Sequence, residues 1–294
     1  MRNDPVTSRF SSQRLSLAFA EWGDRSQPTI ILVHGALDQK RSWDWAAAQL
    51  AGAYHVVAYD LRGHGESDWV SDGDYGVMDH VYDLASLADH LDIVRFILVG
   101  HSLGGNVALR YAGLFPQRVE KLAAIEGLGP SPKMLAERMA QPVDERLREW
   151  IENRRKKSER APRVMASFDE AFGRMKAAHG QLNEAQLEHL TRTGVKVLGS
   201  ERVQWAYDPA INARSPSDIT HDDFVVLLSR ISCPVWLAYG ANSWASNPEK
   251  DGRLDYLSTA HVTEFENAGH WLHHDRFDDF MSALRRFLRG DTPS

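Results

Sequence analysis

The sequence predicts an α/β fold, with a mostly parallel sheet flanked by helices and interrupted by a helical insertion. Three observations lead to this prediction. Short apolar runs recur along the 294-residue chain, helical patterns separate most of them, and one stretch of about 100 residues lacks such runs. Alternation of strands and helices is typical of doubly wound parallel sheets.

The apolar runs have the length and composition of buried strands. They are nearly continuous in aliphatic residues, as expected for parallel strands that are covered on both faces. In chain order they are Thr29 to Val33, His55 to Asp60, Phe96 to Gly100, Leu122 to Glu126 and Pro234 to Gly240, with a further strand-like stretch from Val262 to Phe265. The last helix runs from Phe277 to Leu288 with apolar residues at helical spacing, and Gly290 ends it.

The alternation breaks between about residues 130 and 230. Here one helical pattern follows another with no clear strand, and Asn183 with Gln186 forms a capping pair before one of them. An insertion of this length at a strand end is usually functional. We therefore expect an α/β core from residues 1–129 and 231–294, and a helical cap from residues 130–230 that covers a site.

Composition excludes several classes of function. The chain has 34 Lys and Arg against 40 Asp and Glu, a net charge of -6, so we expect no nucleic-acid partner. No run of about 18 apolar residues occurs and the N-terminus is polar, so we expect neither membrane insertion nor a signal peptide. The single cysteine, Cys233, favours a reducing, cytoplasmic location. The oligomeric state stays open.

One motif indicates a nucleophile. G-H-S-L-G-G, from Gly100 to Gly105, follows an apolar run and precedes a helical pattern. In this strand–turn–helix context, a G-x-S-x-G turn projects the serine hydroxyl above the sheet edge. A loop serine that caps a helix would have the same letters, but the flanking elements favour Ser102 as a nucleophile.

A serine nucleophile needs a base and donors for the oxyanion. His270, in A-G-H-W-L-H-H, follows the last strand-like stretch and is the candidate base. The backbone N–H groups of Ala36, in L-V-H-G-A-L, and of Leu103 are the candidate oxyanion donors. Among the other histidines, we expect His101 to shape the serine loop, His64 to brace a loop by hydrogen bonds, and His273 and His274 to pack or face solvent.

Together, L-V-H-G, Y-D-L-R-G-H-G-E-S, G-H-S-L-G-G and A-G-H-W resemble the α/β-hydrolase superfamily, over about Gln13 to Leu288. The resemblance implies an α/β-hydrolase fold with a cap inserted after strand 6, and it is strongest to the serine hydrolase-like branch. It also implies the chain order nucleophile, acid, base, with no cofactor and no metal. Serine at position 102 argues against haloalkane dehalogenases and soluble epoxide hydrolases, which use an aspartate nucleophile.

The sequence departs from that family at the acid. Most members carry an aspartate after the seventh strand, where this chain reads Y-G-A-N-S-W with Ser243 in its place. Some relatives place the acid after the sixth strand, where Glu126 lies. Glu126 is thus the predicted acid. The alternative is that Glu126 is a hinge residue bonded to backbone amides, and Asp251 and Glu249 are weaker acid candidates.

The predicted function is a cofactor-free serine hydrolase that cleaves a small or medium, largely apolar carboxylic ester through an acyl-enzyme. A C–C bond hydrolase, a thioesterase or amidase, and a ligand-binding protein with little turnover remain alternatives on the same scaffold. The predicted pocket residues are apolar or aromatic: Leu37, Trp43, Leu103, Trp205, Trp244 and Trp271.

Overall fold

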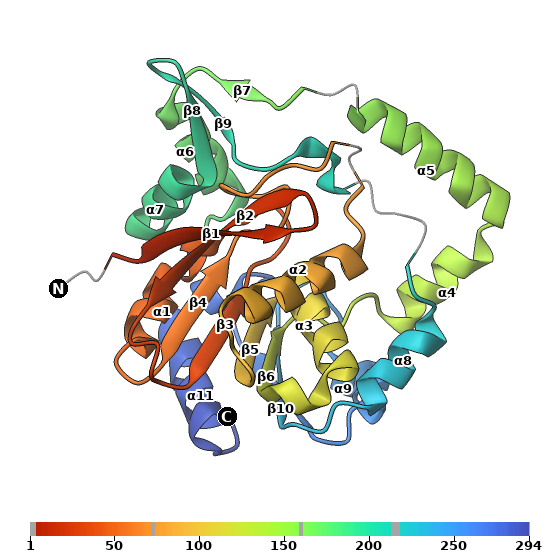
Figure 1. Cartoon of the computed structure of the whole chain (residues 1–294). Helices are drawn as coiled ribbons and strands as arrows, with labels where there is room; N and C mark the ends of the chain where they lie inside the picture. Colours follow the sequence, from red (N-terminus) through yellow and green to blue (C-terminus); the bar gives the residue numbers. More distant parts are fainter. Residues whose placement is uncertain (1–3, 72–73, 159–160, 213–217, 294) are drawn as a thin grey trace.

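An eight-stranded sheet forms the centre of the molecule (Figure 1). The computed structural model describes residues 4–71, 74–158, 161–212 and 218–293. The strand order is β1-β2-β4-β3-β5-β6-β10-β11, and every pair from β4 to β11 is parallel. The strands are β1 (Val6–Ser12), β2 (Leu15–Trp22), β3 (Thr29–Val33), β4 (His55–Tyr59), β5 (Phe96–His101), β6 (Val119–Ile125), β10 (Val235–Gly240) and β11 (Ala260–Phe265). All six predicted strands are confirmed, with small shifts at their ends.

The antiparallel hairpin of β1 and β2 at the sheet edge was not predicted. β1 pairs with β2, and β2 pairs antiparallel with β4. The sequence of β1, V-T-S-R-F-S-S, is mostly exposed, and only Phe10 and Ser12 are buried. An edge strand of this kind lacks the continuous apolar run that identifies the central strands.

Helices cover both faces of the sheet. Successive residues of a central strand point to opposite faces, so each central strand contributes side chains to two buried clusters. Ile31 and Val33 of β3 pack into one buried cluster with α2 (Val77–His90), α3 (Leu103–Leu114) and α8 (His221–Ser229). Ile30 and Leu32 pack into a second cluster with α1 (Asp44–Leu50) and α11 (Phe277–Arg289). Burial on both faces explains the continuous apolar runs.

The remaining short helices lie in the connections between these elements. They are α9 (Pro248–Asp251), α10 (Leu272–Asp275), and the 3-10 helices η1 (Lys40–Trp43), η2 (Pro116–Arg118), η3 (Pro209–Asn212) and η4 (Arg253–Tyr256). Within the described segments, no helix has the length and apolarity that crossing a bilayer requires.

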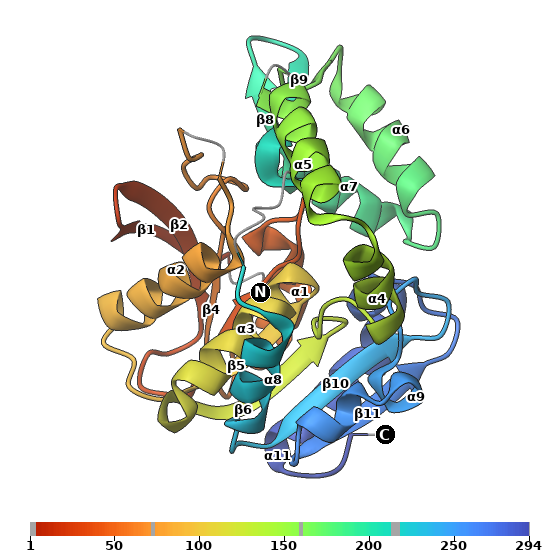
Figure 2. The same cartoon turned by 90° about the vertical axis from the view of Figure 1, so that its right-hand side faces the viewer.

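Most of the chain between β6 and β10 lies above the sheet, and its last helix, α8, lies lower, beside α3 (Figure 2). It contains α4 (Pro132–Ala140), α5 (Val143–Ser158), α6 (Phe168–Ala178) and α7 (Glu184–Gly194), and it ends with α8, which packs on α3 in the core. Asn183 and Gln186 form a reciprocal capping box at the start of α7, as predicted.

The expectation of a cap without strands is wrong. β7 (Val164–Met165), β8 (Val195–Leu198) and β9 (Arg202–Trp205) form a small antiparallel sheet in the order β7-β9-β8. These strands have two to four residues and pair polar side chains such as Lys196 with Gln204. Strands this short carry too few apolar residues to show a periodicity.

The segment between β6 and β10 is anchored to the loops that follow the main strands. Gln39, after β3, donates a 2.8 Å side-chain hydrogen bond to Thr193 of α7. His64, after β4, forms an isolated bridge with Tyr207. These loops lie at the carboxyl edge of the parallel strands, which is where open α/β sheets bind ligands.

Candidate active site

Ser102 lies at a strained turn between β5 and α3. Its backbone has φ 51° and ψ -113°, a conformation that costs a non-glycine residue of the order of 1–3 kcal/mol and is common at active sites. The turn is compact because its glycines carry no side chain. A Cβ on Gly100 would lie 2.4 Å from the carbonyl oxygen of Gly104, and one on Gly104 would lie 2.2 Å from that of Val33. The geometry matches the predicted nucleophile turn.

His270 lies in the loop between β11 and α10 and faces Ser102. Its Nε2 atom is 3.0 Å from the Ser102 Oγ, and its Nδ1 atom contacts the Glu126 carboxylate. Because a carboxylate accepts, Nδ1 donates, and Nε2 is left to accept from the serine hydroxyl. The His101 Nε2 donates to the His270 carbonyl oxygen at 2.8 Å, which fixes the loop that carries the base.

Glu126 directly follows β6 and is 5% exposed, with φ 50°. Its Oε1 accepts a 2.8 Å hydrogen bond from the Gly240 N–H, and its Oε2 contacts His270 and accepts from Ser243 Oγ at 2.6 Å. The two readings of Glu126 from the sequence therefore coincide in part: it binds a backbone amide and it also contacts the imidazole. These partners offset the cost of burying a carboxylate.

Neither of the two weaker acid candidates, Asp251 and Glu249, contacts the His270 ring in the described part of the chain. Asp251 forms an ion pair with Arg253 at 2.8 Å and accepts from Ser246 Oγ at 2.6 Å. Glu249 is exposed at the start of α9. Among the described carboxylates, only that of Glu126 makes a recorded contact with the His270 ring.

Sequence reasoning missed Ser243 as a member of the site. It noted only that a serine replaces the usual aspartate. In the structure, the Ser243 hydroxyl reaches across from the end of β10 to Glu126 and also accepts from the Ala245 N–H at 3.1 Å. Its position in the sequence could have indicated this role. A residue that stands where most family members carry the acidic aspartate is expected to lie near His270.

The loop after β3 approaches Ser102. A Cβ on Gly35, the residue before Ala36, would lie 3.3 Å from the Ser102 Cβ, and Leu103 directly follows Ser102. In the described part of the chain, neither of their N–H groups has a recorded acceptor. Both are therefore available to an oxyanion at this position.

His64 holds that loop in place, as the sequence predicted. Its Nδ1 donates to the Arg62 carbonyl at 3.0 Å, and its Nε2 accepts from the N–H of Leu37 at 3.1 Å. Leu37 has φ 65°, an unusual value that this hydrogen bond stabilises. Burial lowers the pKa of His64 to about 4, so the ring is neutral at pH 7 and can accept at Nε2.

A small pocket lies next to this loop, between it and residues of the segment that joins β6 to β10. Three predicted pocket residues line it, namely Leu37, Trp205 and Trp271, together with Asp38, Gln39, Met175, Leu190, Gly194, Ala206 and Tyr207. Leu103 is half-buried at the start of α3. Trp244 is 68% exposed, and its ring lies 4.8 Å from that of His270.

The prediction that Trp43 lines this pocket is wrong. Trp43 is 1% exposed and packs in the core cluster beneath α1 and α11. Its ring lies 4.9 Å from that of His273. The sequence alone does not distinguish an aromatic residue that lines a pocket from one that packs in the core. The tertiary packing places Trp43 in the core.

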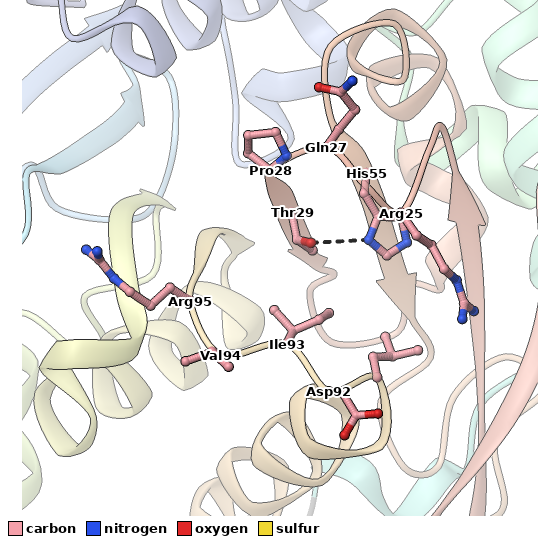
Figure 3. Close-up of a pocket in the computed structure, with 10 residues that line it drawn as sticks. Arg25, Gln27, Pro28, Thr29, His55, Asp92, Ile93, Val94 and Arg95 are labelled. Atoms are coloured by element: carbon pink, nitrogen blue, oxygen red, sulfur yellow. Dashed lines mark hydrogen bonds between the residues drawn. The ribbon is translucent and has the colours of Figure 1, made fainter.

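A second hollow lies at the amino ends of the central strands, opposite to the end that carries the Ser102 turn (Figure 3). Thr29 and His55, the first residues of β3 and β4, line it and are joined by a 3.2 Å hydrogen bond. Residues 91–95, just before β5, form its other side. This hollow is therefore at the amino ends of the strands, far from the Ser102 turn at their carboxyl ends.

Residues 28–277 match the family profile described as the alpha/beta hydrolase fold. A serine hydrolase-like protein of Danio rerio is 27% identical over 92% of this chain and 85% of its own length. The sn-1-specific diacylglycerol lipase ABHD11 of Mus musculus is 27% identical over 90% of this chain and 82% of its own length.

Two further matches are weaker evidence of function, because one covers a smaller part of this chain and the other has a sequence identity that supports only a shared fold. An uncharacterized Mycobacterium tuberculosis protein is 42% identical over 35% of this chain, and the match spans only 30% of that protein. The thioesterase domain of the curacin biosynthetic pathway superposes with a TM-score of 0.83 at 22% identity, covering 96% of this chain and 100% of that domain. The profile and the hydrolase-named relatives support hydrolytic chemistry at this site.

Proposed function

Because the chain belongs to the α/β-hydrolase fold family, we propose that it is a serine hydrolase that cleaves a carboxylic ester. Ser102 is the nucleophile, His270 the base and Glu126 the acid that orients the base. The observation that carries the proposal is the unbroken line of contacts from the Ser102 Oγ through both nitrogens of His270 to the Glu126 carboxylate.

The reaction proceeds through an acyl-enzyme. His270 Nε2 takes the hydroxyl proton as the Ser102 Oγ attacks the carbonyl carbon, and the Ala36 and Leu103 N–H groups stabilise the oxyanion. The tetrahedral intermediate collapses, and the alcohol leaves with the proton from His270. Water then attacks the acyl-enzyme with His270 again as base, which releases the carboxylic acid and restores Ser102.

Glu126 stabilises the imidazolium that forms in both steps. A buried carboxylate at Nδ1 fixes the tautomer and the orientation of the ring. Its Ser243 and Gly240 donors keep the carboxylate itself in place.

The substrate we propose is small or medium in size and largely apolar. The pocket beside the loop after β3 is lined by Leu37, Met175, Leu190, Trp205 and Trp271. The mouse relative is named as a diacylglycerol lipase, which also favours an ester of an apolar acyl group. We further propose that residues 130–230 form the cap that limits access, and that the buried Cys233 reflects a cytoplasmic location.

The test is hydrolysis of p-nitrophenyl esters of increasing acyl length, with wild type beside Ser102→Ala. We expect turnover by wild type, a preferred acyl length, and loss of turnover in the variant. A fluorescent organophosphonate should label wild type at Ser102 and leave Ser102→Ala unlabelled. A protein that neither hydrolyses any ester nor reacts with the phosphonate would contradict the proposal and favour a ligand-binding role.

A further inference from the structure

Three buried side chains converge behind the loop that carries the base. Asp38 follows β3, His101 ends β5, and His273 lies in α10. One ligand atom from each lies within 4.8 Å of the others. The sequence predicts that His101 shapes the serine loop and that His273 packs or faces solvent, and it predicts no role for Asp38.

Three of the four ring nitrogens of this cluster lack hydrogen-bond partners among the described residues. The His101 Nε2 carries the proton that it donates to the His270 carbonyl, so its Nδ1 keeps a free lone pair. Nδ1 of His101 and both ring nitrogens of His273 are buried without a hydrogen-bond partner in the described part of the chain. Gly35 leaves room beside the lone pair, since a Cβ there would lie 2.7 Å from Nδ1.

The carboxylate of Asp38 is held in place but not saturated. It accepts hydrogen bonds from the Gln39 N–H at 2.8 Å and from the Ser42 Oγ at 2.9 Å, one on each oxygen. Each carboxylate oxygen has a second lone pair. Among the described residues, Asp38 makes no recorded ion pair.

We propose that Asp38, His101 and His273 bind a divalent first-row transition metal of the zinc class. Two imidazoles and one carboxylate suit such ions. The hydrogen bond from His101 to a backbone carbonyl, and those from Gln39 and Ser42 to Asp38, are the outer contacts that orient metal ligands in proteins. Of the three, Asp38 also lines the pocket next to the loop after β3.

The charges and the geometry are compatible with this ion. Burial lowers the pKa of both rings well below its ordinary value, so they are neutral ligands. Burial raises the pKa of Asp38 to about 7, so its carboxyl group must give up any proton that it carries when the metal binds. Ligand atoms at about 2.0–2.2 Å from a tetrahedral zinc lie about 3.4 Å apart. The ligand atoms, which lie within 4.8 Å of one another, therefore need to approach by up to about 1.4 Å when the metal binds. A bound ion would lie one hydrogen bond away from the loop of His270.

The test uses the full chain after treatment with a chelator. Co²⁺ is titrated while the visible absorption is recorded, and Zn²⁺ binding is measured by calorimetry. We expect one equivalent per chain with the absorption of a nitrogen-ligated Co²⁺, and at least tenfold weaker binding in Asp38→Asn and in His273→Gln. His274→Gln is the matched control, since His274 is also buried with two unpartnered nitrogens but lies outside the cluster. His261→Gln controls for exposed histidines.

Two outcomes overturn the proposal. One is no Co²⁺ or Zn²⁺ binding by wild type up to 1 mM, at about the weak limit of a useful affinity. The other is wild-type affinity in Asp38→Asn and His273→Gln, which means that the metal binds elsewhere. If both variants fail to fold, anomalous diffraction from wild-type crystals with Zn²⁺ decides: density between Asp38, His101 and His273 supports the site, and its absence there rejects it.

Discussion

The Ser243 hydroxyl donates a 2.6 Å hydrogen bond to Oε2 of Glu126, the same oxygen that contacts His270. Ser243 follows β10 and Glu126 follows β6, and these two strands are parallel neighbours. Their carboxyl ends therefore lie side by side, and an acid at either end can face the same imidazole. In this chain the carboxylate is on β6, and the position on β10 supplies a donor to it.

Removing this donor should weaken catalysis moderately. Hydrogen bonds to charged groups contribute about 1.5–3 kcal/mol, so Ser243→Ala is expected to lower kcat by about 10- to 100-fold with little change in KM. Steady-state kinetics on the preferred ester measures this. Ser243→Thr, which keeps a hydroxyl, is the control. Wild-type kcat in Ser243→Ala would mean that the Gly240 N–H alone positions the acid.

Removing the acid should be more severe. Glu126→Gln keeps the shape but loses the charge that stabilises the imidazolium, and we expect kcat to fall by about two to four orders of magnitude. Asp251→Asn, which disturbs only the Arg253 ion pair and the Ser246 contact, should stay near wild type. The reverse pattern would assign the acid to Asp251.

The acid should also be movable between the two strand ends. Glu126→Gln combined with Ser243→Asp places a carboxylate after β10, where most family members carry it, and we expect the double variant to recover at least tenfold over Glu126→Gln alone. Ser243→Asp by itself places two carboxylates together and should be impaired. A double variant no better than Glu126→Gln argues that the path from residue 243 to His270 is closed.

The close packing at Gly104 should make it intolerant of any side chain. A Cβ there meets the Val33 and His34 carbonyl oxygens at 2.2 and 2.6 Å, and backbone cannot move away as a flexible side chain can. We expect Gly104→Ala to lower the free energy of unfolding by about 2–4 kcal/mol, within the range of severe substitutions. Gly52→Ala, where no atom lies within 4 Å, is the matched control and should be neutral or slightly stabilising. Urea denaturation compares the two variants.

Burial of His64 should make the protein less stable in acid. Burial lowers its pKa from an ordinary 6.5 to about 4 in the folded state. The unfolded state therefore binds a proton at a higher pH, and stability is lost as pH falls from about 6.5 to about 4. The contribution of this one group is at most about 3 kcal/mol, at 1.36 kcal/mol per pKa unit.

His64→Gln tests this, because an amide can replace both hydrogen bonds but does not titrate. The free energy of unfolding measured at pH 7 and pH 4.5 should fall less in this variant than in wild type. The exposed His261→Gln should keep the wild-type slope. An unchanged slope in His64→Gln would assign the acid sensitivity to other groups, such as His274, whose pKa burial lowers to about 3.

The sequence alone determined the central strands, the Ser102 turn and the position of His270. Those features depend on local patterns: apolar runs that must be continuous when both faces are covered, and a glycine-flanked turn of a few residues. It also favoured Glu126 as the acid over the weaker candidates Asp251 and Glu249. The hairpin at the sheet edge and the small cap sheet escaped it, since exposed or very short strands show no apolar periodicity.

Only the tertiary structure decided which groups meet. Glu126 reaches His270 because β6, β10 and β11 are successive parallel strands, which brings the loops after β6 and β11 to the same end of the sheet, although the two residues lie 144 positions apart in the chain. The same folding brings Ser243 to Glu126, buries Trp43, and gathers Asp38, His101 and His273 from three separate segments. Such contacts depend on the order and register of distant strands, which no local pattern of residues encodes.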